Sequence, residues 1–223
     1  MNKLYVQYGS GAIWTPGDWI NFDASPTLVV QRTPVLGRLL KRRLNVIFPD
    51  TVRFGDITKG LPGVADNACD GIYCSHVLEH LSLTDFHKAL EHTYRMLRPG
   101  GTFRLVVPDL EYYARQYIAR LDAGDPTASL QFGRDTLLGQ EVRPRGVKGL
   151  LSTFWGNSHH RWMWDFASIS QALTAAGFTA IRRCQFNDSP DPMFRQVEAA
   201  DRFENCLAVE CRKAAVTSPP APR

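Results

Sequence analysis

The sequence predicts an α/β fold built on a doubly wound, mostly parallel sheet, and three observations predict it. Short apolar runs that read as buried strands alternate with amphipathic stretches that read as helices. Polar residues follow several strands where each strand ends, as at the ligand-binding edge of an open sheet. The 223 residues, 44% of them hydrophobic and 22% charged, suffice for one globular core. We expect one domain over residues 1–213 and a disordered tail over 214–223.

The first half of the chain supplies five of the strands. Each run is closed by glycine, proline or polar residues, and the runs cover residues 4–8, 19–22, 51–54, 71–74 and 102–107. Thr33-Pro34 indicates a helix start, because apolar residues from Val35 to Ile47 follow at helical spacing. A second helix carries Phe86, Leu90 and Tyr94 and ends before the Pro99-Gly100-Gly101 turn.

The last part of the chain changes pattern. Asp165 can cap a helix that ends at Gly177, where a positive φ is expected. Two strands follow over residues 178–186 and 206–212, and the Asn-, Asp- and Pro-rich connection between them leaves no room for a convincing helix. An antiparallel final pair is therefore expected.

Composition excludes several classes of protein. No apolar run approaches the ~20 residues that a membrane helix needs, and the N-terminus has no signal-peptide core. The five cysteines contain no CxxC pair, which argues against a disulfide framework and against a zinc site. A net charge of +4 is too small to imply nucleic-acid binding. We expect a soluble cytoplasmic protein without metal, membrane or nucleic-acid partners.

The predicted strand ends converge on one crevice. They carry, in chain order, Gly9-Ser10-Gly11, Asp23, Asp56, Ser75-His76 and Asp109. The interval between Gly11 and Asp23 is too short for the helix that holds a dinucleotide pyrophosphate. A ligand that contains ribose and adenine but no phosphates does not need this helix for binding. One acid can accept the ribose hydroxyls and a second the adenine amino group, which points to S-adenosylmethionine (SAM).

At this point the chain resembles a known family, the class I SAM-dependent methyltransferases, and within it the small type 11 group. The resemblance covers residues 3–109 and 164–212, with a shortened glycine motif and a truncated first crossover. Its most specific pieces are Val77-Leu78-Glu79-His80 and Arg98-Pro99-Gly100-Gly101, accompanied by Tyr8-Gly9-Ser10-Gly11, the run Trp19-Ile20-Asn21-Phe22-Asp23, Gly55-Asp56-Ile57 and Ala176-Gly177-Phe178.

The resemblance implies a seven-stranded Rossmann-like sheet in the order 3-2-1-4-5-7-6 with the seventh strand antiparallel. It implies SAM as cofactor and S-adenosylhomocysteine as product. The cofactor-binding residues would be Gly9, Ser10, Gly11, Asp23, Asp56, Ile57, Cys74, Ser75 and His76.

Each of these residues also has a purely structural interpretation. Gly9 and Gly11 can serve only a turn, and Asp23 only an Asx turn before Ser25. Asp56 can cap the turn that ends at Thr58, and His76 can be a structural histidine at a helix start. Glu79 and His80 are interpreted as bracing the following helix, and Asp109 as an N-cap.

Residues 110–164 read as an insertion after the fifth strand that covers the acceptor side. It combines basic residues with aromatic ones, which suits an anionic or sugar-like acceptor: Arg134, Arg143, Arg145, Lys148, Phe154, Trp155, His159, His160, Arg161, Trp162 and Trp164. Trp155, His159, His160 and Trp162 are predicted nearest the methyl group. The candidate catalytic residues are His159, His160 and Asp109, with His76 also available as a base. The alternative is a solvated basic loop with core aromatics.

The sequence thus favours a methyltransferase acting on a small-molecule or sugar-containing acceptor. A catalytically inactive methyltransferase-like partner subunit is the alternative from another class. A nicotinamide oxidoreductase is disfavoured, since neither a phosphate-binding helix nor a Tyr-x-x-x-Lys pair is visible. The acceptor, the methylated atom and the oligomeric state stay open.

Overall fold

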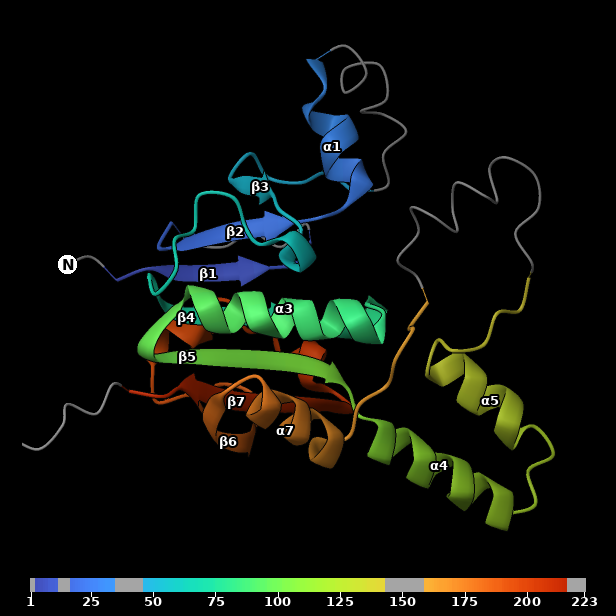
Figure 1. Cartoon of the computed structure of the whole chain (residues 1–223). Coiled ribbons are helices and arrows are strands. Elements are labelled where there is room, and N and C mark those ends of the chain that lie inside the picture. Colours follow the sequence, from blue (N-terminus) through green and yellow to red (C-terminus); the bar gives the residue numbers. More distant parts are fainter. Residues whose placement is uncertain (1–2, 12–16, 35–45, 143–158, 216–223) are drawn as a thin grey trace, which may run out of the picture.

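A computed structural model describes residues 3–11, 17–34, 46–142 and 159–215, and its centre is a seven-stranded sheet (Figure 1). The strand order is β3-β2-β1-β4-β5-β7-β6. Strands β1 to β5 pair in parallel, and β7 runs antiparallel to both β5 and β6. The predicted fold class, strand order and antiparallel final pair are confirmed. The strands are β1 Tyr5–Tyr8, β2 Trp19–Asp23, β3 Val52–Phe54, β4 Cys69–Ser75, β5 Leu97–Pro108, β6 Phe178–Cys184 and β7 Cys206–Lys213.

Among the described residues the α-helices are α1 Pro26–Arg32, α3 Leu83–Met96, α4 Leu110–Asp122, α5 Ala128–Asp135 and α7 Phe166–Ala175. Single 3₁₀ turns are η2 Ile57–Lys59, η3 Leu78–His80, η4 Pro192–Gln196 and η5 Ala200–Phe203. No helix in this part of the chain is long and apolar enough to cross a membrane.

Two boundaries differ from the sequence prediction. The helix after β2 begins at Pro26, because the Ser25 hydroxyl accepts a hydrogen bond from the Thr27 amide and caps it. Thr33 is the C-cap of α1 and Pro34 is helical again, which agrees with the predicted helix start at Thr33-Pro34; the rest of that predicted helix falls largely on residues 35–45, outside the described residues. Strand β5 begins at Leu97 rather than Thr102, with a register shift opposite Cys69 and Gly71.

The two faces of the sheet are covered by different kinds of structure. Helices α3 and α7 lie on one face in Figure 1, and their Phe86 and Leu173 belong to the same apolar cluster as Ile72 and Leu105 of the sheet. The alternate residues of the same strands face the other way. There the β6–β7 connection covers the sheet through two 3₁₀ turns, and its apolar cluster contains Tyr5, Trp19, Tyr73, Val106, Phe194 and Val197.

An internal arginine attaches this connection to the sheet. The Arg104 side chain on β5 is fully buried and pairs with three carboxylates, those of Asp188, Glu198 and Glu210. It also donates a hydrogen bond to the Gln185 carbonyl. Although burial opposes its charge, these partners raise the pKa of the guanidinium above its ordinary value. Arg104 therefore remains charged inside the fold.

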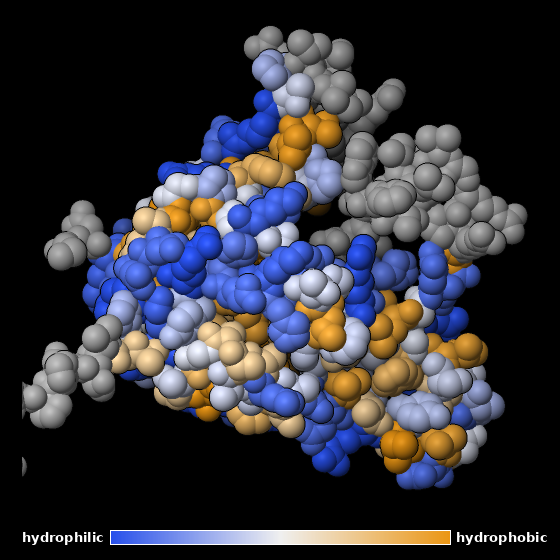
Figure 2. Space-filling model, in the orientation of Figure 1, coloured by the Kyte–Doolittle hydropathy of each residue, from blue (hydrophilic) through white to orange (hydrophobic). Residues whose placement is uncertain are grey.

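The insertion after β5 is less buried than the rest. Helix α4 buries none of its residues, and Ile118, Leu121 and Leu130 of α4 and α5 are 50%, 52% and 61% exposed. Figure 2 shows apolar side chains gathered over the region of these helices. The two helices hold each other through Tyr117 and Phe132, whose ring centroids are 5.7 Å apart.

Candidate functional site

A cavity of about 350 Å³ opens at the carboxyl ends of β1 and β2. Its volume falls within the roughly 300–1,000 Å³ typical of small-molecule sites. In Figure 1 these strands point toward the side where α4 and α5 lie. The cavity is lined by Tyr8, Gly9, Asp23, Ala24, Ser25, Pro26, Gly55, Asp56, Ile57, His76, Val77 and Leu81.

The glycine turn after β1 needs glycine at its first position. Gly9 has φ +71°, and a Cβ built there would lie 1.9 Å from Cγ2 of Val77. The Gly9 and Ser10 amides both donate to the Phe22 carbonyl, at 2.8 and 3.2 Å. Ser10 is fully buried, and Gly11 has φ +59°. The turn is thereby fixed against the end of β2.

Asp23 is the last residue of β2, and both of its carboxylate oxygens accept hydrogen bonds. Its Oδ2 accepts a hydrogen bond from the Gly11 amide at 2.9 Å, and its Oδ1 accepts one from the Ser25 amide at 2.7 Å. The side chain lines the cavity and the residue is 9% exposed. Since each carboxylate oxygen has two lone pairs, one acceptor site on each oxygen remains. Asp23 therefore forms the Asx turn with Ser25, and this turn fixes the orientation of its carboxylate.

Asp56 also lines the cavity while capping a turn. Its Oδ1 accepts from the amide and the hydroxyl of Thr58, at 3.0 and 2.7 Å, and its Oδ2 lies 3.3 Å from Nζ of Lys59. Burial alone would raise the pKa of Asp56, but these contacts outweigh it and lower the pKa below its ordinary value. Asp56 is therefore an anion at neutral pH. Its neighbour Ile57 is buried and supplies an apolar wall.

The three residues at the end of β4 differ in where they lie. Cys74 is buried in the apolar core and does not line the cavity. Ser75 faces Arg202, which donates to its carbonyl at 3.2 Å. His76 lines the cavity, with φ +55° and its amide bonded to the Val106 carbonyl.

His76 is held by contacts on both ring nitrogens. Its Nε2 lies 3.0 Å from the Arg202 carbonyl oxygen and 3.7 Å from the Cys206 sulfur, and its Nδ1 lies 3.3 Å from Oε1 of Glu79. Burial alone would lower the pKa of His76, but the contacts with Cys206, Glu79 and the carbonyl raise it to about 10.

The other predicted catalytic residues lie in two separate parts of the structure. Asp109 lies at the end of β5, caps α4 by accepting from the Glu111 amide at 3.0 Å, and does not line the cavity. His159 and His160 lie beside η3 instead: the His80 ring contacts the His159 carbonyl at 3.1 Å, and the His80 and His160 ring centroids are 5.0 Å apart. Burial lowers the pKa of His160.

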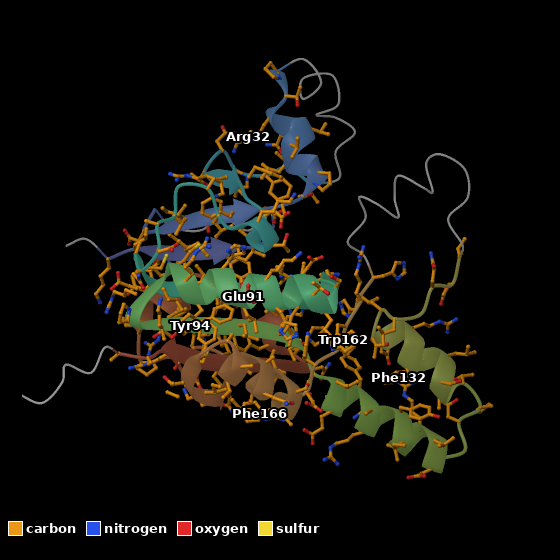
Figure 3. The ribbon with its side chains drawn as sticks, in the orientation of Figure 1. Arg32, Glu91, Tyr94, Phe132, Trp162 and Phe166 are labelled. Atoms are coloured by element: carbon orange, nitrogen blue, oxygen red, sulfur yellow. The ribbon has the colours of Figure 1, made fainter. Side chains whose placement is uncertain are left out.

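The aromatic residues of the insertion divide in the same way. Trp164 is buried and stacks on Phe86 with ring centroids 4.0 Å apart, so it belongs to the core. Trp162, labelled in Figure 3, is 42% exposed. Its amide donates to the Glu79 carbonyl at 3.1 Å. Arg134 pairs with Glu141. Arg143, Arg145, Lys148, Phe154 and Trp155 lie outside the described residues.

Several cavity residues were not predicted. The segment Ala24 to Pro26 lines the cavity because α1 begins there, and the Ser-Pro pair that caps this helix was the available signal. Val77 and Leu81, which lie at the two ends of η3, also line the cavity. Their position depends on how η3 folds back over the glycine turn, which no local pattern encodes.

Comparison with known proteins adds a family match. Residues 19–105 match the family model of the type 11 group described as a methyltransferase domain. This range contains β2, β4 and most of β5, together with Asp23, Asp56 and η3. No curated protein matches the chain.

Solved structures with related folds are distant in sequence. One is a complex between the Haloferax volcanii Trm112 methyltransferase activator and a putative methyltransferase, with 16% identity, a TM-score of 0.48, and coverage of 96% of this chain and 83% of that one. A SAM-dependent methyltransferase from Archaeoglobus fulgidus has 14% identity, a TM-score of 0.47, and coverage of 95% and 86%. Human N-acetylserotonin methyltransferase in complex with SAM has 16% identity and a TM-score of 0.45. There 95% of this chain is covered, and the chain spans about half of the human enzyme, 48%.

Proposed function

This chain carries the methyltransferase domain of the class I SAM-dependent enzymes, and from that premise we propose that it methylates a small-molecule or sugar-containing acceptor at the carboxyl edge of the sheet. The enzyme class and the SAM cofactor predicted from the sequence are confirmed at the level of the domain. The acceptor class and the residue assignments below are the proposal.

The observation that carries the site assignment is the oriented carboxylate of Asp23 in the cavity wall. Two backbone amides fix it, and its remaining lone pairs suit the two hydroxyls of a ribose. Asp56 lies on the same cavity as an anion and suits the exocyclic amino group of adenine. Gly9 has no side chain and lies close to Val77, so only backbone atoms of Gly9 are present at the end of β1. The residues present therefore fit SAM.

The chemistry asked of the protein is limited, since the SAM sulfonium already supplies an activated methyl group. The chain has to hold the donor, align the acceptor with the bond to the methyl group and exclude water. Proximity of that kind can supply roughly 7–11 kcal/mol. Gly9, Asp23 and Asp56 serve the first task by holding the donor at the strand ends.

The acceptor side is assigned to the insertion. Helix α4 begins directly after Asp109, where β5 leaves the sheet, and the Arg161 and Trp162 amides return to the Glu79 carbonyl on η3. Both ends of the insertion therefore lie at the edge where the cavity opens. His159, which is exposed, is the candidate for accepting a proton from the acceptor; the other predicted base, His160, is bonded to the Thr136 backbone and its Nδ1 is buried. Asp109 is less suited, because its carboxylate caps α4 and faces Arg183 at 3.5 Å.

The assignment of Asp23 is tested by titration calorimetry with S-adenosylhomocysteine and with its analogue lacking the ribose 2′-hydroxyl. The wild-type chain should prefer the hydroxylated ligand. In Asp23→Ala the affinity should fall by the cost of a charge-assisted hydrogen bond, about 1.5–3 kcal/mol, and the preference between the two ligands should disappear.

The comparison of two ligands separates recognition from folding. If Asp23→Ala only loosened the Gly11 turn, both ligands would lose affinity equally and the preference would persist. That result, with an unchanged circular dichroism spectrum, would assign Asp23 to the Asx turn alone. Ser25→Ala is the matched control, since it keeps the backbone amide bonded to Asp23 and removes only the cap of α1.

A further inference from the structure

Three metal-ligating side chains meet beside the cofactor cavity, where η3 contacts the end of the insertion. The ligand atoms of Glu79, His80 and His160 all lie within 4.8 Å of one another. Glu79 and His80 belong to η3, whereas His160 comes from the segment that leads into α7 and passes the start of α3 in Figure 1. Two distant parts of the chain thus contribute to one cluster.

The carboxylate in this cluster is buried and lacks hydrogen bonds. The Glu79 side chain is 0% exposed, and among the described residues neither of its oxygens accepts a hydrogen bond. Its charged contacts are His76, at 3.3 Å from Oε1, and His80, at 4.0 Å from the same atom. A buried carboxylate is costly unless cations compensate it; His76 supplies such a contact to Oε1, whereas Oε2 has no charged or hydrogen-bonded partner among the described residues.

The two imidazoles are oriented as metal ligands usually are. The His80 Nδ1 lies 3.1 Å from the His159 carbonyl oxygen, which can only accept, so the proton is on Nδ1 and the Nε2 lone pair faces Glu79. His160 hydrogen-bonds to the Thr136 backbone through its other nitrogen, and its Nδ1 is buried without a partner. Donation of the second ring N–H to a backbone carbonyl is the common outer-shell arrangement of histidine ligands.

We propose that Glu79, His80 and His160 bind one divalent transition-metal ion of the class that imidazole favours, represented by Zn²⁺. Two imidazoles and one carboxylate form a three-ligand set that leaves a further coordination position open. Bonds of about 2.0–2.1 Å keep any two ligand atoms within roughly 4.2 Å, so the cluster contracts slightly on binding. The ion would link the end of the insertion to η3.

The experiment is a Zn²⁺ titration of the full chain after treatment with a chelator, without SAM or acceptor. We expect one equivalent of Zn²⁺ per chain, a rise in the thermal denaturation midpoint, and little response to Mg²⁺, which prefers oxygen ligands. His80→Ala, His160→Ala and Glu79→Gln should each weaken Zn²⁺ binding by about tenfold or more. X-ray absorption of the Zn²⁺ complex should report two imidazoles in the first coordination sphere.

The other histidines provide matched controls. His87 is exposed on α3, and His159 contributes only its carbonyl to His80, so His87→Ala and His159→Ala should bind Zn²⁺ like the wild type. Absence of a stoichiometric site, or equal affinity in His160→Ala and the wild type, overturns the proposal. Glu79→Gln keeps the shape of the buried side chain, which guards against a variant that merely fails to fold. Because neither SAM nor acceptor is present, these results are independent of the proposed function.

Discussion

At the scale of single residues, the acids of the cavity have two uses at once. Asp23 accepts from the Gly11 and Ser25 amides, and Asp56 accepts from Thr58, so both are turn residues in the ordinary sense. Both also line the cavity. The turn holds the carboxylate in one orientation, which reduces the entropy lost when a ligand hydrogen-bonds to it. The structural and the functional interpretation of these residues are therefore compatible.

The residues at the end of β4 show the limit of sequence reasoning at this scale. Their position after a predicted strand correctly placed His76 on the cavity, but alternation along the strand sends the Cys74 side chain into the core. The contact of Ser75 with Arg202 joins residues 127 positions apart. Likewise the cluster of Glu79 and His80 with His160 depends on a long-range return of the chain. Local spacing does not encode such contacts.

Asp56→Ala should lower the affinity for adenine ligands more than for their analogue without the exocyclic amino group. The reason is that this amino group is a donor and would lose its acceptor. The measurement is the ratio of the two dissociation constants, taken with S-adenosylhomocysteine and its purine-riboside counterpart. Lys59→Ala is the control, since it removes the ion pair but keeps the carboxylate. Equal loss for both ligands would leave Asp56 as the cap of η2 and nothing more.

At the scale of elements, helix starts and strand ends were more predictable than helix lengths. The α7 start at Asp165 is confirmed with a capping box between Asp165 and Ser168, and Gly177 has φ +96° as expected. The Ser25-Pro26 pair was interpreted as a turn although it carries the same signals that were used at Thr33-Pro34. Both signals mark helix starts in the structure, where Pro26 and Pro34 are helical.

The β6–β7 connection depends on one buried arginine, which gives an element-scale prediction. Arg104→Ala should lower the free energy of unfolding by about 3–5 kcal/mol, because it leaves buried carboxylates unpaired. Chemical denaturation monitored by circular dichroism measures this. Arg182→Ala is a matched control: it shares Asp188 and Glu210 but its side chain is 38% exposed, so the loss should be markedly smaller. Equal losses would contradict a special role for Arg104.

At the scale of the whole molecule, the sheet is covered asymmetrically. One face has α3 and α7, and the other has the β6–β7 connection, whose Phe194 packs on Tyr5 and Trp19. The sequence predicted the strands of the sheet, since an apolar run closed by turn residues is a local pattern. It did not predict what covers the second face. That cover depends on ion pairs between Arg104 and acids 84 to 106 positions further along the chain.

The cover of the second face is attached by ion pairs between Arg104 and carboxylates. The stability of the fold should therefore fall when acid protonates these carboxylates. Burial alone would raise the pKa of Asp188, but hydrogen bonds from Arg182, from the Gln185 amide and from Arg104 lower it below its ordinary value. A folded-state pKa below the unfolded one stabilises the fold above the unfolded pKa of about 3.9. This contribution is lost as the pH falls through the folded pKa, because protonation then favours neither state.

We therefore expect the thermal denaturation midpoint of the wild-type chain to fall between pH 5 and about pH 2, and part of that fall to depend on Asp188. Asp188→Asn should have a lower midpoint than the wild type at pH 7, and the difference should shrink as the pH is lowered through the carboxylate range. Asp122→Asn, at the exposed end of α4, controls for the change in net charge. A gap between wild type and Asp188→Asn that stays constant from pH 7 to pH 2 would show that the carboxylate charge of Asp188 does not stabilise the second face.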